Sequence, residues 1–250
     1  MPSVKNAGID ELHLSLIIPA FNEEARIGKS LDRILSYLQS QPYSSEVIIV
    51  DDGSWDRTVE LVQECLGNNS GVRIHRQSRR LGKGAAVKQG MLLGDGRYLF
   101  FSDADLSVPI ETLSLFLSNL EKDSDVTIGT RQKAGAVIEI HQPFYRELLG
   151  KAYVRLSNWI LGLQVSDFTC GFKGFRKEAA RELFSRQWLK NWSFDAEILY
   201  LARLKGYRVR EIPVTWRDDR ATKVRLWKDA VTSFLGLMII RLYHYVGRYD

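Results

Sequence analysis

Three clusters of acidic residues follow short apolar runs of strand length and could together bind a cation. The clusters are Glu23-Glu24, Asp51-Asp52 and Asp103-Ala104-Asp105. Each cluster alone is compatible with an ordinary turn, because Asp and Asn are common turn residues. Carboxylates gathered at one edge of a sheet repel one another unless a cation or hydrogen-bond donors lie nearby. The three clusters together therefore predict a binding site.

The segment Asp103-Ala104-Asp105 has the spacing of a divalent-cation site. Asp103 and Asp105 stand two positions apart after a strand. One carboxylate can therefore face a bound cation while its neighbour reaches another group of the ligand. Oxygen ligands favour Mg²⁺ or Mn²⁺ over zinc, and Mg²⁺ is typically held by one or two carboxylates together with substrate phosphates. We therefore predict that Asp103 and Asp105 bind Mg²⁺ or Mn²⁺.

Two common nucleotide-binding motifs are incomplete or absent. Gly82-Lys83-Gly84 resembles a piece of a phosphate-binding loop, but the full motif requires Ser or Thr directly after the lysine. The Gly-x-Gly-x-x-Gly fingerprint does not follow the first predicted strand. A P-loop nucleotidase and a dinucleotide-dependent oxidoreductase are therefore disfavoured.

The elements that position these clusters alternate between strand and helix through residue 131. The predicted strands are Leu14–Ile18, Val47–Val50, Val72–His75, Tyr98–Phe101 and Val126–Ile128. Helical spacing of apolar residues occurs between them in Arg26–Leu38, Thr58–Leu66, Ala85–Leu93 and Leu113–Leu120. This order, with strands that are apolar at consecutive positions, predicts an α/β fold of three layers around a mostly parallel sheet. Ligands of such sheets bind at the carboxyl ends of the strands, where the acidic clusters fall.

The second half of the chain has a less regular pattern. Helical spacing covers Arg146–Leu163, and Val209–Trp216 has the character of a strand. Residues 224–246 predict one amphipathic helix, preceded by five basic residues against two acidic ones in Arg217–Lys228. Basic residues beside an apolar helical face suit a membrane interface. A contact between copies of the chain, or packing of the helix on the domain, remains an alternative.

Length and composition are those of one globular protein. The chain has 250 residues, of which 45% are hydrophobic, and a formal net charge of +5, which suits an anionic ligand without requiring one. Cys65 and Cys170 are too few for a disulfide framework or a zinc site, which favours a reduced, cytoplasmic setting. The polar N-terminal residues do not resemble a secretory signal, and no segment has the about 20 apolar residues of a membrane span.

Several motifs together resemble those of family 2 inverting glycosyltransferases with the GT-A fold. The first four are Pro19-Ala20-Phe21-Asn22-Glu23, Val50-Asp51-Asp52-Gly53-Ser54, Gly82-Lys83-Gly84 and Asp103-Ala104-Asp105. The later ones are Gly129-Thr130-Arg131, residues 167–173, Phe194-Asp195-Ala196-Glu197 and residues 216–223. These later motifs are similar to those of polyprenyl-phosphate sugar transferases, and most similar to the dolichyl-phosphate beta-glucosyltransferase group. One departure is Ala221-Thr222, where that group usually has Gly-Ser before the lysine.

The resemblance implies an enzyme that moves glucose from UDP-glucose to a polyprenyl phosphate of dolichyl type, with Mg²⁺ or Mn²⁺, and releases UDP. It implies a nucleotide-sugar pocket formed by Pro19, Phe21, Glu23, Val50, Asp52, Lys83, Asp103 and Ala104. Arg131, Arg217 and Lys223 would bind phosphate groups, and Asp105 and Arg131 would act in catalysis. Residues 1–217 would form the catalytic domain. Residues 218–250, a phosphate-binding loop and the amphipathic helix, would belong to the same domain.

Asp195 has two open roles. A saccharide hydroxyl acceptor would need a general base, for which Asp195 is the candidate. A phosphate monoester needs none, because its second pKa of about 6 leaves it largely ionised at neutral pH. Asp195 would then stabilise the first turn of the helix that follows, where a carboxylate is favoured by the helix dipole. Glu197 is assigned to the structure of that helix.

Other functions remain as alternatives. A related transferase could use another sugar nucleotide, such as GDP-mannose, or a saccharide hydroxyl acceptor, and a non-catalytic nucleotide-sugar or lipid-binding module is a further alternative. A nucleic-acid binder is least supported, because the basic residues follow no recognised motif. We expect peripheral association with the cytoplasmic face of a membrane. The oligomeric state, the exact sugar and the polyprenyl length stay undecided.

Overall fold

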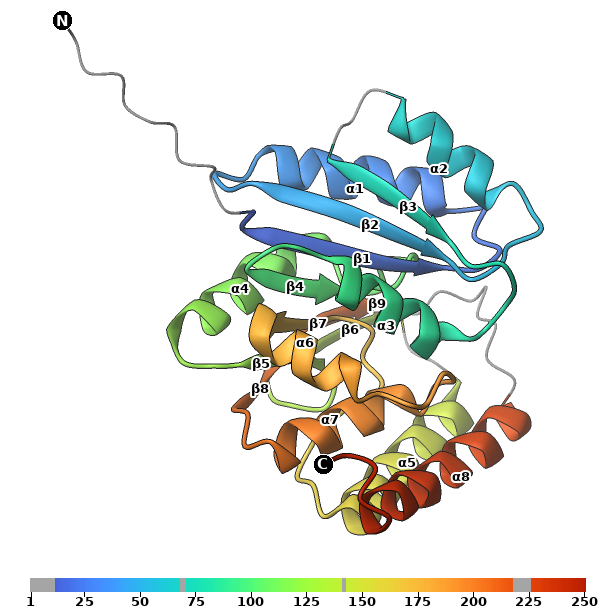
Figure 1. Ribbon diagram of the computed structural model, residues 1–250, viewed down its shortest axis with the longest axis vertical. Coiled ribbons are helices and arrows are strands. Elements are labelled where there is room, and N and C mark those ends of the chain that lie inside the picture. The colour runs from blue at the N-terminus through green and yellow to red at the C-terminus, as the bar shows by residue number, and fades with distance from the viewer. Residues whose placement is uncertain (1–11, 68–70, 141–142, 218–225) are drawn as a thin grey trace, which may run out of the picture.

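The computed structural model describes residues 12–67, 71–140, 143–217 and 226–250 and is centred on a seven-stranded sheet (Figure 1). Along the sheet the strand order is β3-β2-β1-β4-β7-β5-β8. The strands are β1 (Leu14–Ala20), β2 (Ser45–Asp51), β3 (Val72–Arg76), β4 (Tyr98–Phe101), β5 (Val126–Thr130), β7 (Lys173–Arg176) and β8 (Val209–Pro213). Only β7 is antiparallel to its neighbours, β4 and β5. The predicted mostly parallel sheet is therefore confirmed.

Helices cover both faces of this sheet and complete three layers (Figure 1). On one face α1 (Ile27–Gln39), α2 (Thr58–Leu66) and α4 (Leu113–Lys122), with the 3₁₀ helix η1 (Ile110–Thr112), pack into one apolar core. On the other face α3 (Lys83–Leu93), α6 (Lys177–Ser185) and α7 (Phe194–Leu204) pack into a second core. The helix α3 lies very close to β1, because a Cβ added at Gly90 would stand 2.3 Å from Ile17 Cγ2.

The predicted elements of the first half agree with the structure to within a few residues. The strand β1 continues two residues beyond the predicted end, through Pro19 to Ala20, because its backbone pairs with β2 as far as Asp51. The helix α3 begins two residues early, at Lys83, directly after Gly82. Gly82 has a φ of +111°, which only glycine adopts without strain, so the glycine sets the point where the helix starts.

The second half differs more from the prediction. The predicted strand Val209–Trp216 is two strands, β8 and β9 (Thr215–Arg217), and β9 pairs with β6 (Val137–Ile140) in a separate two-stranded sheet. The division follows Pro213, which has no backbone N–H with which to continue a ladder. Neither β6 nor β7 was predicted, because charged residues interrupt their apolar patterns: β6 contains Glu139, and β7 contains the buried Lys173 and ends at Arg176.

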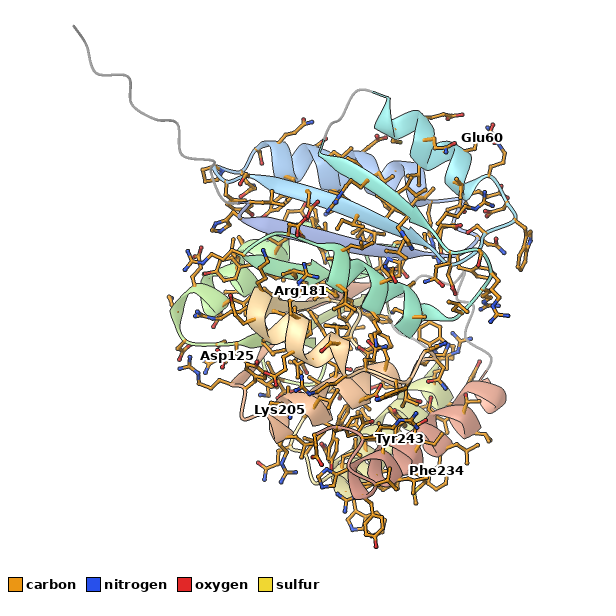
Figure 2. All side chains as sticks on the ribbon, viewed as in Figure 1. Glu60, Asp125, Arg181, Lys205, Phe234 and Tyr243 are labelled. Atoms are coloured by element: carbon orange, nitrogen blue, oxygen red, sulfur yellow. The ribbon has the colours of Figure 1, made fainter. Side chains whose placement is uncertain are left out.

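The helices α5 (Phe144–Leu161) and α8 (Leu226–Tyr245) lie side by side at the end of the molecule beyond β8 (Figure 1). Leu237 and Ile240 of α8 are fully buried, so this helix packs on the domain, as one alternative predicted. Phe234, labelled on α8 in Figure 2, and Met238 are exposed. The side chains of residues 226–230, on which part of the predicted apolar face falls, lie outside the described residues. Within the described ranges no helix has the length and apolar character needed to cross a membrane.

Candidate active site

The carboxyl ends of β1, β2 and β4 lie next to one another and bring the three acidic clusters together. Since β1 is hydrogen-bonded to β2 on one side and to β4 on the other, Ala20 stands beside Asp51 and Ile17 beside Phe101. The backbone continues this alignment beyond the strands, where the Asp52 N–H donates to the Ala20 carbonyl oxygen at 2.8 Å. The predicted convergence of the clusters is thus confirmed.

Asp52 links the end of β2 to the start of α3. Its carboxylate accepts hydrogen bonds from the backbone N–H groups of Leu81 at 2.7 Å and of Gly82 at 2.9 Å. Burial raises the pKa of Asp52, while these two donors oppose that rise. The buried carboxylate therefore anchors residues 82–84, here called the Lys83 turn. The predicted contact of Asp52 with a nucleotide base did not include this role.

Lys83 forms an ion pair with the first carboxylate of the predicted cation site. Its Nζ lies 2.5 Å from Asp103 Oδ1 and 5.0 Å from the ring centroid of Trp192. Burial disfavours the charge of Lys83, but Asp103 and then Asp195 outweigh it and raise the pKa of Lys83. Asp103 rests directly on Gly171, where an added Cβ would stand 1.9 Å from Asp103 Oδ2. Any side chain at position 171 would thus displace this carboxylate.

Asp105 is the second carboxylate of the predicted cation site. It accepts a hydrogen bond from the Ser107 N–H at 2.9 Å. Burial, and then the neighbouring charge of Asp103, raise the pKa of Asp105. A divalent cation beside both carboxylates would relieve this repulsion, so the residues fit Mg²⁺ or Mn²⁺. The described part of the chain offers no group of three His, Cys, Asp or Glu for a metal, so further oxygens would come from water and a bound diphosphate.

Asp105 also lines a pocket of about 320 Å³ between α1, the turn after β4 and the small sheet of β6 and β9. Its basic side chains are Lys29, Arg33 and Arg217. Arg217 pairs with Glu139, with Nη2 2.7 Å from Oε2, so a bound anion would compete with that exposed pair. A larger and more open hollow of about 590 Å³ adjoins it along α1, but none of the strand-end carboxylates lines that hollow.

Arg131 stands at the end of β5 in a paired arrangement that the sequence did not reveal. Its Nε lies 2.7 Å from Asp167 Oδ2 and its Nη2 2.9 Å from Asp167 Oδ1, a two-point ion pair. Nη2 also donates to Thr169 Oγ1 at 2.8 Å, and Trp216 lies 5.1 Å from the guanidinium. Burial disfavours both charges, but the pairing raises the pKa of Arg131 and lowers the pKa of Asp167. Asp167 thus neutralises much of the charge that was predicted to bind phosphate.

Asp195 lies in the first turn of α7, as predicted, but it is buried and ion-paired. Asp195 Oδ1 lies 2.5 Å from Nζ of Lys173 on β7. Lys173 also donates to the carbonyl oxygens of Phe168 at 3.0 Å and Cys170 at 2.7 Å, so the three donors of its ammonium group are used. Burial raises the pKa of Asp195, and Lys173 and Lys83 oppose that rise. The only sequence signal for a buried role of Lys173 is its position between apolar residues, in Gly-Phe-Lys-Gly-Phe.

The remaining predicted nucleotide-sugar residues lie around the end of β1. Phe21 has the Arg80 guanidinium 4.0 Å from its ring centroid and Trp55 at 4.9 Å edge-on, which builds an aromatic surface beside the strand ends. Glu23 forms an ion pair with Arg26. Pro19 lies in β1, and Ala104, between Asp103 and Asp105 in the sequence, is buried. Val50 is fully buried in the core, so its side chain presents no surface to a base. Lys223 lies outside the described residues.

The sheet order and the acidic segment after β4 define a GT-A glycosyltransferase. The chain belongs to glycosyl transferase family 2, whose family model matches residues 15–184. The predicted family, fold and enzyme class, a hexosyltransferase, are confirmed.

Relatives of known name cover most of the chain. A dolichyl-phosphate beta-glucosyltransferase of Saccharomyces cerevisiae is 34% identical over 96% of this chain and 77% of its own length. One of Dictyostelium discoideum is 30% identical over 96% of this chain and 77% of its own length. A crystal structure of Mycobacterium tuberculosis glucosyl-3-phosphoglycerate synthase with Mn²⁺, UDP-glucose and phosphoglyceric acid has a TM-score of 0.68 at 18% identity, covering 91% of this chain and 79% of that one. At that identity the likeness extends to the fold alone.

Proposed function

We propose that this enzyme transfers glucose from UDP-glucose to a polyprenyl phosphate of dolichyl type, with inversion at the sugar carbon and release of UDP. The observation that carries the proposal is the pair Asp103 and Asp105 at the end of β4, with Lys83 2.5 Å from Asp103. The relatives named above are dolichyl-phosphate beta-glucosyltransferases, which supports the same donor sugar and acceptor. These two carboxylates would hold the cation, and a pocket with basic side chains adjoins Asp105.

Asp103 and Asp105 would hold Mg²⁺ or Mn²⁺, which when bound supplies Lewis-acid stabilisation of the charge that develops on the leaving diphosphate. Glucosyl-3-phosphoglycerate synthase, which has a similar fold, has been crystallised with Mg²⁺ and UDP and with Mn²⁺ and UDP-glucose. Lys83 adds a fixed positive charge beside Asp103 at the side of the diphosphate. Phe21 and its aromatic neighbour Trp55 provide a surface on which a nucleoside base can lie.

The acceptor phosphate would enter the pocket that Asp105 shares with Lys29 and Arg217. One of its oxygens forms the new bond to the sugar carbon as the bond from that carbon to the UDP oxygen breaks, and the electron pair of that bond leaves with UDP. An ionised phosphate needs no base for this step. Asp195 is buried and ion-paired to Lys173, which favours a positioning role over that of a general base and therefore favours a phosphate over a hydroxyl acceptor.

The lipid acceptor places the reaction at a membrane surface, and we propose peripheral association with the cytoplasmic face. Exposed apolar residues gather on the adjacent helices α5 and α8; they are Phe144, Leu148 and Trp159 on α5 and Phe234, Leu235, Met238 and Leu242 on α8. The chain has only two cysteines, Cys65 and Cys170, which suits a reducing compartment. The same face could instead join two copies of the chain.

Vesicle flotation tests the membrane proposal. The variant Leu235→Glu/Met238→Glu should lose binding to vesicles that contain anionic lipid, whereas Leu115→Glu, at a position on α4 that is equally exposed, should retain it. Equal flotation of both variants would contradict a role for α8. Size-exclusion chromatography of the same variants shows whether the face joins two copies instead.

Product analysis tests the reaction itself. The protein is incubated with Mg²⁺ or Mn²⁺, a short polyprenyl phosphate and either UDP-glucose, GDP-mannose or another sugar nucleotide, and the products are identified by mass spectrometry. We expect a glucosylated polyprenyl phosphate and one equivalent of UDP from UDP-glucose. A product from GDP-mannose alone, or transfer only to a saccharide hydroxyl, would replace the proposal with one of its alternatives.

A further inference from the structure

Glu197 on α7 is completely buried, and its carboxylate is held by three hydrogen-bond donors from outside its helix. Oε2 accepts from the backbone N–H of Leu189 at 2.8 Å, and Oε1 accepts from the N–H of Trp188 at 3.1 Å and from the hydroxyl of Tyr249 at 2.7 Å. Burial raises the pKa of Glu197, and these three donors oppose that rise. Because a buried acceptor that loses a donor costs free energy, the loss of the Tyr249 hydroxyl should loosen this arrangement.

The helix α8 and the residues after it contact residues 187–193, the segment before α7, at more than one point. The Tyr249 side chain is buried, and its ring lies 6.1 Å from that of Tyr243. The neighbouring Arg248 guanidinium stands 3.9 Å from the ring centroid of Trp188. Within α8, a Cβ added at Gly236 would stand 2.1 Å from Ser193 Oγ, so the helix backbone rests on the end of the same segment.

The segment of residues 187–193, here called the bridging segment, also contacts the turn that carries Lys83. Gln187 Nε2 donates to the Gly84 carbonyl oxygen at 2.9 Å, and the Ala85 N–H donates to the Lys190 carbonyl oxygen at 3.3 Å. A Cβ added at Gly82 would stand 2.5 Å from that same Lys190 oxygen, which shows how closely the two backbones approach. The bridging segment therefore lies between Tyr249 and the Lys83 turn and touches both.

We propose that Tyr249 is a positioning residue of the transfer reaction. By holding Glu197 and the bridging segment, it fixes the turn of residues 82–84 and so keeps Lys83 Nζ against Asp103. The inference rests on the proposed function only where it assigns Lys83 to the diphosphate of the donor. Tyr249 itself touches neither Lys83 nor Asp103 and acts through the chain of contacts described above.

Hydrogen exchange tests the link from Tyr249 to the turn without any ligand. The variant Tyr249→Phe removes only the hydroxyl and keeps the ring, so the fold should persist. Tyr243→Phe is the matched control. It removes a hydroxyl from the same aromatic cluster, and that hydroxyl makes no hydrogen bond within the described ranges. We expect faster exchange in peptides of residues 82–90 and 187–193 for Tyr249→Phe and no change for the control. A change confined to residues around 249, or none, overturns the inference.

Calorimetric titration with UDP in the presence of Mn²⁺ tests the effect on the site. We expect Tyr249→Phe to weaken UDP binding about three- to tenfold, the size of one lost hydrogen bond, and Tyr243→Phe to bind as the wild type does. In a Lys83→Met background the Tyr249→Phe change should have no further effect. An equal loss in both backgrounds, or no loss in either, overturns the inference. If the wild type does not bind UDP, the proposed function fails, and the exchange comparison still judges the link to the turn.

Discussion

The two halves of the chain hold their functional side chains by different means. In the first half, Asp103 and Asp105 are placed by the strand end that precedes them, and their immediate neighbours are mainly backbone groups and Lys83. In the second half, Arg131 and Asp195 each form an ion pair with a buried charged residue, Asp167 and Lys173 respectively. The first half thus places its carboxylates at strand ends that the apolar pattern predicts, whereas the charged groups of the second half depend on buried partners that no such pattern predicts.

The largest expected effect belongs to the first half. Asp105→Asn should lower the transfer rate about a hundred- to a thousandfold, because it removes one of the two carboxylates that we propose hold the cation. Since burial and Asp103 raise the pKa of Asp105, removal of its charge should leave the thermal midpoint unchanged or raise it. Rate assays and thermal unfolding check both parts. The matched variant Asp123→Asn, at the exposed end of α4, should keep the wild-type rate.

Breaking the buried ion pair of the second half should lower the free energy of unfolding more than breaking an exposed ion pair does. Lys173→Met leaves Asp195 buried without its partner and should lower the free energy of unfolding by about 3–5 kcal/mol. Arg33→Met removes a cation from the exposed pair with Glu111 and should cost below about 1 kcal/mol. Denaturant titrations of both variants make the comparison. Similar losses in the two would show that the buried pair has no special weight.

Gly171→Ala tests the point where the two halves meet. The new Cβ would stand 1.9 Å from Asp103 Oδ2, so the carboxylate must move, and a displacement of this size should lower the transfer rate about a hundredfold. Gly150→Ala is the control, because on α5 an added Cβ meets no described atom within 4 Å outside its own helix. Wild-type rates in Gly171→Ala would mean that the position of Asp103 has little influence on the reaction.

The two buried aspartates of the second half should respond to acid in opposite directions. The fold lowers the pKa of Asp167 below its ordinary value of 3.8, so its contribution to stability is present at neutral pH and is lost as the pH falls through the folded pKa. The fold raises the pKa of Asp195, so its contribution is greatest below 3.8 and is lost as the pH rises through the folded pKa. The free energies of unfolding of Asp167→Asn and Asp195→Asn are compared with that of the wild type between pH 3 and pH 7. On acidification, the stability lost in Asp167→Asn should become smaller, and the stability lost in Asp195→Asn should become larger. Parallel curves would contradict these assignments.

The same contrast explains how much the sequence could predict. The strands β1, β2 and β4 are apolar at consecutive positions, so both their existence and the meeting of the acidic clusters follow from the pattern. The strand β7 could not be predicted, since it includes Lys173, whose burial depends on Asp195 22 positions away. Tyr249 and Glu197 are 52 positions apart, and no local pattern connects them.

Individual roles within the site were also harder to predict than its position. Arg131 was predicted to bind phosphate from its motif alone, but only folding brings Asp167 into a two-point pair with it. Asp52 likewise holds the backbone of Leu81 and Gly82, which lie 29 and 30 positions further along the chain. Spacing therefore indicated where polar groups gather, and the partner of each group came from the structure.

UDP binding with and without Mn²⁺ tests most directly whether the paired carboxylates after β4 form the donor site. Titration calorimetry of the wild type should give binding that depends strongly on Mn²⁺, and Asp105→Asn should lose that dependence. UDP binding of equal strength without the metal, and in the variant, would contradict the account.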